Sequence, residues 1–347
     1  MESGIFHTTY QTDMTLRRTY AQKIRIALFL LFMIVFPFFA NRYALSLANT
    51  IGIATIGAIG LNILVGYTGQ ISLGQGGFLA VGAYTAGILT ARMGIPWYAS
   101  TLIACLVTAL VGAIFGIPSL RLKGLYLAIA TLAAQEIIIW VVTHWKGLTG
   151  GVDALVVPNP TLFGIQINTD FHFYWVVWAL AGLTALATIN LFRTHYGRAF
   201  IAIRDQDIAA EVMGVNTFRY KLLAFAVSSF FVGLAGALTA HYRSIVTWER
   251  FTIDVSVLYL AMIIIGGLGS VSGSFFGAAF MTLLPQILSN LGSELEGYFP
   301  FIESIIPFIQ QAAFGLVIIL FLIFEPEGLS KLWRNIKDYF RLWPFSY

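Results

Sequence analysis

With 347 residues, 58% of them hydrophobic and only 10% charged, the chain has too much apolar surface for a soluble domain, where about 25% of residues are charged. The single cysteine, Cys105, excludes an internal disulfide and a cysteine-based metal site. The net charge of +4 is modest, and no basic run is interleaved with stacking aromatic residues as in a nucleic-acid surface. The composition therefore indicates an all-α, multi-pass membrane protein.

The first 25 residues are mostly polar. A cleavable signal peptide has its charges much closer to its start, so we interpret residues 1–25 as a cytoplasmic segment. The membrane domain is predicted over residues 26–324, and residues 325–347 form a predicted cytoplasmic tail. Apolar runs recur through the membrane domain and predict about ten spans: 26–41, 43–65, 70–91, 97–118, 124–143, 172–192, 221–243, 254–268, 273–291 and 304–324.

Two uncharged stretches are too long for single spans. The 49 residues between Arg42 and Arg92 would form a helix of about 74 Å, over twice the hydrocarbon core of roughly 30 Å. The 39 residues between Asp254 and Glu294 would reach about 59 Å. Both must fold back, at the Gly-rich breaks of residues 66–70 and 266–270. Either break could instead be a re-entrant or interrupted helix, which is tolerated at depth where it lines a cavity.

The two breaks form a weak internal repeat. ILVGYTGQISLGQGG (63–77) and IIIGGLGSVSGSFFG (263–277) share Ile, three Gly and Ser at equivalent places, although two unrelated Gly-rich hairpins would look alike. Transporters built from repeats bind substrate at such interrupted segments. We therefore predict a substrate pathway, with interhelical hydrogen bonding as the alternative role, for Asn62, Gln70, Ser72, Gln75 and Ser272.

Basic residues concentrate in four places, which hold fifteen of the twenty lysines and arginines. If each span reverses the side, all four clusters fall in the cytoplasm, as the positive-inside rule expects. An even number of spans then places both termini there. The clusters are Arg17, Arg18, Lys23 and Arg25; Arg121 and Lys123; Arg193, Arg198, Arg204, Arg219 and Lys221; and Lys331, Arg334, Lys337 and Arg341.

Glu136, inside the predicted span 124–143, is the main candidate for an intramembrane ionisable group. It would suit a stand-alone, ion-driven transporter, or it is a protonated or paired structural residue near the outer interface. Other functional motifs are missing from the sequence. There is no G-x-x-x-x-G-K-[ST] phosphate loop, no H-E-x-x-H zinc motif and no G-x-S-x-G nucleophile motif. We therefore expect no catalytic residue, no metal site and no ATP site in this chain.

The predicted cytoplasmic loop 193–221 reads RTHYGRAFIAIRDQDIAAEVMGVNTFRYK, and residues 199–213 favour a short helix. Such a loop suits docking to a soluble partner, although a plain connector is the alternative. Ala209 and Ala210, with Gly214 four residues later, resemble the E-A-A-x-x-x-G coupling motif of ABC-importer permeases, with Ile208 in place of Glu. The resemblance implies an ATPase-coupling site that comprises Arg204, Asp205, Ala209, Ala210 and Gly214.

Longer segments resemble the LivM-type permease of branched-chain amino-acid ABC importers. They are LNILVGYTGQISLGQGGFLAVGAY (61–84), SLRLKGLYLAIATLA (119–133), the loop 193–221, YLAMIIIGGLGSVSGSFFGAAF (259–280) and FEPEGL (324–329). The resemblance implies a permease subunit of the inner (plasma) membrane with a LivH-type permease, two cytoplasmic ATPases and a periplasmic binding protein as partners. The partner ATPases would use ATP, and this chain would bind no cofactor. Urea and aromatic-acid importers have similar subunits, so the substrate stays open between these classes.

Overall fold

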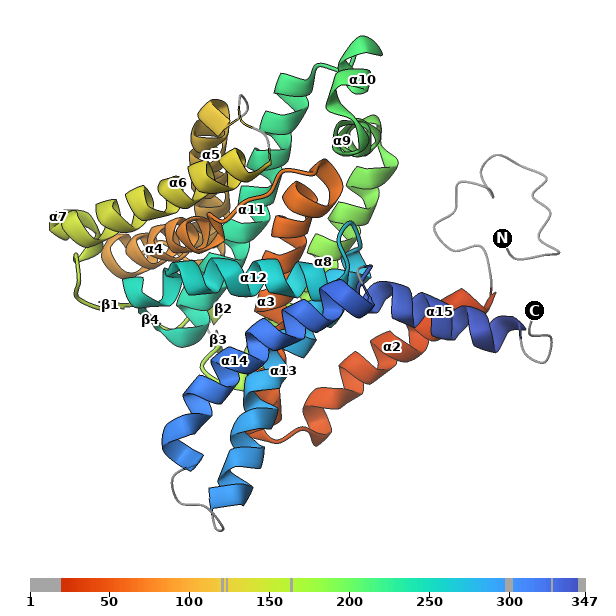
Figure 1. Ribbon diagram of the computed structural model, residues 1–347. Coiled ribbons are helices and arrows are strands. Elements are labelled where there is room, and N and C mark those ends of the chain that lie inside the picture. Colours follow the sequence, from red (N-terminus) through yellow and green to blue (C-terminus); the bar gives the residue numbers. More distant parts are fainter. Residues whose placement is uncertain are drawn as a thin grey trace. The chain divides into compact units, whose positions relative to one another are not determined.

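The computed structural model describes residues 20–119, 122, 124–162, 165–296, 302–325 and 327–342 (Figure 1). The predictions for Arg17, Arg18, Arg121 and Lys123 lie outside the described residues. A helix overlaps each predicted span: α2 (Tyr20–Phe39), α3 (Arg42–Thr68), α4 (Gln75–Met93), α5 (Trp97–Ser119), α6 (Leu125–His144), α8 (Asp170–Arg193), α11 (Thr217–Arg243), α12 (Ile253–Gly266), α13 (Val271–Glu296) and α14 (Ile302–Phe324).

Shorter elements connect these helices. They are α7 (Lys146–Thr149), α9 (His195–Asp205), α10 (Asp207–Val212), the 3₁₀ helix η1 (Trp248–Phe251), α15 (Leu329–Leu342), and strands β1 (Leu155–Val156), β2 (Thr161–Leu162), β3 (Ile165–Gln166) and β4 (Ile245–Val246). The strands form two antiparallel pairs, β1 with β4 and β2 with β3. The single helix predicted at 199–213 is wrong in detail, because extended backbone at Gln206 separates α9 from α10.

Six of the described helices are long and apolar enough to cross a membrane, or seven if α14 and α15 form one bent span. They are α3, α5, α6, α8, α11 and α13. The all-α, multi-pass membrane class is therefore confirmed. The count of ten crossings stays a prediction, because α12 has only 14 residues and α4 starts five residues later than the predicted span 70–91. The cytoplasmic termini and the internal repeat also stay predictions.

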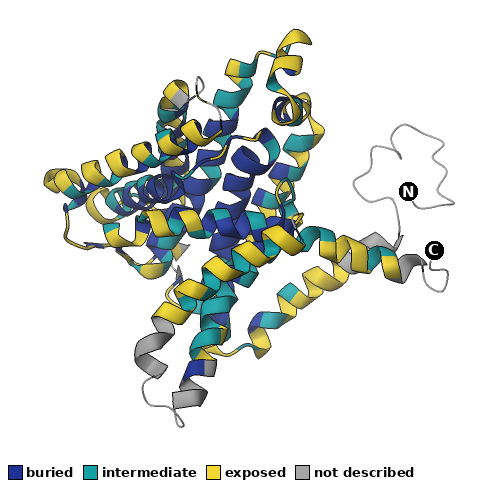
Figure 2. Cartoon of the chain, in the orientation of Figure 1, coloured by how far each residue is buried: buried dark blue, intermediate teal, exposed yellow. Residues whose placement is uncertain are grey.

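The chain divides into two compact units, Met1–Ser46 and Leu47–Tyr347. The first unit holds α2, whose apolar side chains, such as Leu31, Phe32 and Phe38, are exposed. The second unit holds all remaining helices beyond the start of α3. Its core surrounds α3, which is 89% buried over its most apolar stretch, against 39% or less for α5, α6, α8 and α13. Figure 2 shows this buried centre.

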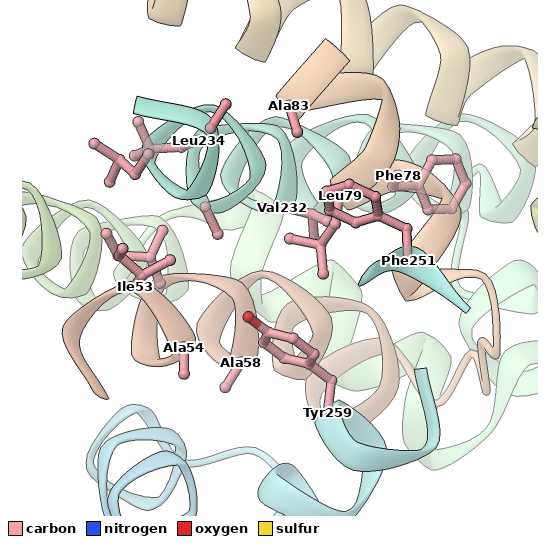
Figure 3. Close-up of a cluster of buried hydrophobic side chains, with 14 of the residues drawn as sticks. Ile53, Ala54, Ala58, Phe78, Leu79, Ala83, Val232, Leu234, Phe251 and Tyr259 are labelled. Atoms are coloured by element: carbon pink, nitrogen blue, oxygen red, sulfur yellow. The ribbon is translucent and has the colours of Figure 1, made fainter. Parts of the chain in front are cut away.

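Small residues explain why α3 is so deeply buried. A Cβ atom at Gly52 would collide with Val177 of α8, one at Gly57 with Tyr259 of α12, and one at Gly60 would lie 3.0 Å from Ser228 O of α11. Helices approach closely in membranes where such small residues face one another. Figure 3 shows part of the buried hydrophobic cluster, to which α3 contributes Ile53 and Ala58, α4 Leu79, α11 Val232 and α12 Tyr259.

Candidate functional site

The first Gly-rich break is a non-helical segment that lies against α3. After α3 ends at Thr68, Gly69 takes a left-handed conformation (φ +70°), and α4 begins only at Gln75. The Gln75 side chain donates to Gly57 O at 3.0 Å, in the middle of α3. Eleven residues of α3 separate Gly57 from Thr68, so residues 69–74 return along the helix over about 16 Å. The interrupted-helix alternative therefore describes this break better than a tight turn.

Polar side chains of other helices satisfy the backbone of this segment. Leu73 N donates to Thr131 Oγ1 at 2.9 Å, and Gly76 N donates to Ser256 Oγ at 2.7 Å. In the amide orientation that satisfies both of its polar atoms, the buried Gln135 donates to Leu73 O and accepts from Ile253 N, each at 3.0 Å. Non-helical backbone can be buried in a membrane protein only when its groups are paired in this way.

The second break, residues 267–270, is a tight turn that one buried amide of α3 holds. Asn62 Nδ2 donates to Ser270 O at 3.0 Å and to Ser274 Oγ at 2.8 Å, while its Oδ1 accepts from Gly269 N at 2.9 Å. Gly267 and Gly269 have φ of +120° and +72°, which favours glycine over other residues. One buried amide thus anchors each break, Asn62 the second and Gln135 the first.

Arg204, in the last turn of α9, connects both breaks to the loop 193–221. Its Nη1 donates to Gly66 O at 3.2 Å, at the end of α3. Its side chain also covers two glycines, because a Cβ atom at Gly69 would lie 3.2 Å from Arg204 Cγ and one at Gly269 would lie 3.3 Å from Arg204 Nη1. Nε and Nη2 both donate to Asp205 Oδ1, at 3.0 and 2.9 Å. The guanidinium is therefore held by hydrogen bonds to the Asp205 carboxylate and to Gly66 O at the first break.

The short helix α10 presents apolar side chains to solvent. Ile208, Val212 and Met213 are 64%, 82% and 84% exposed, and Figure 2 shows α10 as mainly exposed. Ala210 is buried against the rest of the protein, whereas Ala209 is exposed. Gly214 follows the helix with φ +87° and nothing within 4 Å of a Cβ atom. The sequence motif indicated Ala209, Ala210 and Gly214, but it missed Val212 and Met213, whose signal was apolar character within a charged loop.

The predicted pathway residues separate into paired and unpaired groups. Ser72 and Gln75 are buried and hydrogen-bonded within the protein, like Asn62. Gln70 is also buried, but its Nε2 has no hydrogen-bond partner among the described residues. It lines a cavity of about 410 Å³, together with Arg204 and Asp207. Ser272 is exposed at the start of α13. Gln70 is therefore the predicted pathway residue best placed to contact a solute in this conformation.

Glu136 is exposed, whereas its neighbour Gln135 is buried in the first break. No group of three or more His, Cys, Asp or Glu side chains that could hold a metal ion is found in the described part of the chain.

At the opposite ends of α8 and α11, the connection 146–171 meets the turn after α11. There β1 pairs with β4, and Tyr242 OH donates to Asp170 Oδ1 at 2.8 Å.

Comparison with known proteins gives consistent matches over most of the chain. Residues 43–324 match the family described as "Branched-chain amino acid transport system / permease component". The high-affinity branched-chain amino acid transport system permease protein LivM of Salmonella typhimurium is 32% identical, over 91% of this chain and 76% of its own length. A probable LivM of Methanocaldococcus jannaschii is 26% identical over 66% of each chain.

More distant relatives are also import permeases. The autoinducer 2 import system permease protein LsrC of Escherichia coli O9:H4 is 23% identical, over 91% of this chain and 90% of its own. No solved structure matches the chain.

Proposed function

Because this chain belongs to the family of branched-chain amino-acid transport permeases, we propose that it is the membrane subunit of an ATP-driven importer of branched-chain amino acids. Separate ATPase subunits would supply the energy. The LivM relatives favour branched-chain amino acids over urea or aromatic acids, which similar subunits of other importers carry. The proposal places the chain in the inner membrane with both termini in the cytoplasm.

One observation carries the ATP-driven mechanism. The exposed α10 follows α9 after the single extended residue Gln206, and Arg204 in the last turn of α9 contacts both Gly-rich breaks. A partner that moved α10 would therefore move Arg204 against Gly66 and the glycines of both breaks. We assign the docking role to α10 and the positioning role to Arg204 and Asp205. In this mechanism the breaks open and close the pathway, and Gln70 contacts the solute.

Two separate surfaces of the protein indicate where the proposed partners bind. Two cytoplasmic ATPases would bind α10 of this chain and of a LivH-type permease. A periplasmic binding protein would deliver substrate to the opposite side, where β1, β4 and the connection 146–171 lie together. The relatives support the general kind of assembly, since both LivM and LivH proteins match this chain. The chain itself would bind neither ATP nor another cofactor.

Reconstitution tests the proposed function. We expect the chain, co-purified with its partner permease and ATPases in liposomes, to show ATPase activity that rises when the binding protein is loaded with a branched-chain amino acid. Uptake into the liposomes should require ATP. A stable permease pair that binds no ATPase subunit would contradict the proposal.

The glycine after α10 provides a specific test of coupling. Asparagine tolerates a left-handed conformation far better than a β-branched residue, for which it costs roughly 1–2 kcal/mol. Gly214→Asn should therefore preserve ATP-driven uptake, and Gly214→Val should lower it several-fold. Gly94→Val is the matched control, because Gly94 has φ +65° and equally open surroundings but lies after α4. Equal loss of uptake in both valine variants would mean that the effect is general strain.

Two adjacent residues distinguish this mechanism from a stand-alone, proton-driven transporter. Glu136→Gln should leave uptake within about twofold, because the exposed carboxylate contributes to neither break. Gln135→Leu leaves Leu73 O and Ile253 N unpaired, at about 1–3 kcal/mol for each buried group, and should lower both the unfolding temperature and uptake. If Glu136→Gln abolished uptake, or if this chain alone accumulated substrate under a proton gradient, the ion-driven mechanism would be favoured.

A further inference from the structure

A polar cavity of about 480 Å³ lies between the second break and α15. Hydroxyl groups of Ser270 and Ser272 line one wall, and their oxygens are 3.1 Å apart. Basic side chains of α15 line the other wall, namely Lys331, Arg334 and Lys337. Such a combination of hydroxyl donors and cations suits an oxyanion, above all a phosphate.

The cavity remains cationic despite one carboxylate. Glu327 binds Lys331 Nζ at 2.6 Å and Arg334 Nη2 at 3.3 Å. The hydrogen bond from Lys331 lowers the pKa of the Glu327 carboxyl, so this group is ionised. Three basic side chains against one carboxylate give a net formal charge of +2. Among the described residues, the ion pairs of Glu327 involve Lys331 and Arg334 and not Lys337, which also lines the cavity.

Apolar side chains surround this cationic cavity and distinguish a lipid from a soluble anion. Leu268 and Trp333 line it and are 50% and 58% exposed. The other face of α15 exposes Leu332, Ile336 and Tyr339. Helices with one basic face and one apolar face lie in the membrane interface. The position of α15 is also consistent with the membrane interface, since this helix begins at Leu329, soon after the apolar α14 ends at Phe324 (Figure 1).

We propose that this cavity binds the phosphate of an anionic lipid headgroup, with the acyl chains along Trp333 and the apolar face of α15. Lys331, Arg334 and Lys337 neutralise the phosphate, and the hydrogen-bonded hydroxyl pair of Ser270 and Ser272 donates its remaining proton to it.

Occupancy of the cavity affects the second break directly. Gly328 packs against the backbone of Gly267, and a Cβ atom at Gly267 would collide with Ser330 Oγ. A bound lipid therefore holds α15 against the turn that Asn62 anchors from the opposite side. Binding itself does not depend on the proposed transport function, so the experiment measures lipid retention and thermal unfolding.

The test uses the full chain with the subunits that co-purify, in nanodiscs of phosphatidylcholine with or without phosphatidylglycerol. We expect phosphatidylglycerol to raise the unfolding temperature and to stay bound in native mass spectrometry. Combining Lys331→Gln, Arg334→Gln and Lys337→Gln should reduce the retained lipid about tenfold or more, because each basic residue near a membrane surface attracts anionic lipid. The matched control, Arg193→Gln with Arg198→Gln and Arg219→Gln, removes equal charge elsewhere and should retain the lipid.

A second variant avoids disturbing the ion pairs of Glu327. Ser272→Asp keeps every cation and places a carboxylate in the cavity, so it should also release the lipid. Retention of phosphatidylglycerol in both the triple variant and Ser272→Asp would overturn the proposal. Equal loss in the arginine control would show non-specific attraction and would overturn it too. If inorganic phosphate at matched ionic strength stabilised the protein as much as phosphatidylglycerol does, the site would belong to a soluble anion and not to a lipid.

Discussion

Replacement of Arg204 by alanine is expected to lower ATP-driven uptake about tenfold or more, because a hydrogen bond from a charged group is worth about 1.5–3 kcal/mol. The variant loses the bond to Gly66 O and the cover over Gly69 and Gly269. Docking of the ATPase should persist, since α10 is unchanged. We therefore expect ATP hydrolysis to continue without a matching rise in uptake, and the ratio of substrate imported to ATP hydrolysed measures this directly.

Two companion variants show whether Arg204 acts through its geometry. Arg204→Lys keeps the charge and one donor but loses the planar fork that binds Asp205 and Gly66 together, so it should recover uptake only in part. Arg198→Ala is the matched control, because Arg198 lies on the same helix and is exposed, and its guanidinium donates to Arg193 O at 3.4 Å rather than to either break. Normal uptake in Arg204→Ala would exclude a positioning role, and an equal defect in Arg198→Ala would indicate a general charge effect.

Acidic residues on the exposed apolar face of α10 are expected to abolish binding of the ATPase. Burial of one Val or Met side chain contributes about 1.5–3 kcal/mol, so Val212→Asp with Met213→Asp should weaken binding at least about 100-fold. The dissociation constant of the ATPase for the permease in nanodiscs measures the change. Folding should be unaffected, because both side chains are more than 80% exposed.

Ile208 supplies the control for that experiment. The coupling motif that this loop resembles has Glu at the position of Ile208, so Ile208→Glu adds a charge to the same helix at a position where that motif has one. We expect binding to stay within a few-fold of the unchanged chain. If Ile208→Glu lost binding as completely as the double aspartate variant, any charge on α10 would be disruptive. If neither variant altered binding, the ATPase would dock elsewhere.

Most helices could be predicted from the sequence, because a membrane span requires a continuous apolar run of known length. The predicted span 43–65 corresponds to α3 (Arg42–Thr68), and the predicted span 124–143 corresponds to α6 (Leu125–His144). The same reasoning failed at residue 70. The run of residues 70–91 is uncharged and mostly apolar, but its first five residues are not helical and α4 starts at Gln75. Apolar character shows that a segment is buried, and it does not show whether its backbone is helical.

The family was also evident from local motifs, and Ala209, Ala210 and Gly214 lie in or directly after α10, while their coupling role stays a prediction. The roles of the intramembrane polar residues were not evident. Asn62 adjoins the first break in sequence, yet it anchors the second, more than 200 residues away. The sequence singles out Glu136 as the ionisable residue of this span, and only the fold shows that its neighbour Gln135 holds the first break.

The sequence alone was therefore enough to identify a helical membrane permease and the approximate positions of most of its helices, and it predicts that the loop 193–221 docks a partner. These properties follow from composition, from charge placement and from short motifs, all of which are local. The tertiary structure alone decided how the two breaks are held and that Arg204 reaches both. The reason is physical: each buried amide or carbonyl must find a partner, and here that partner comes from a helix distant in sequence, so no local pattern can identify it.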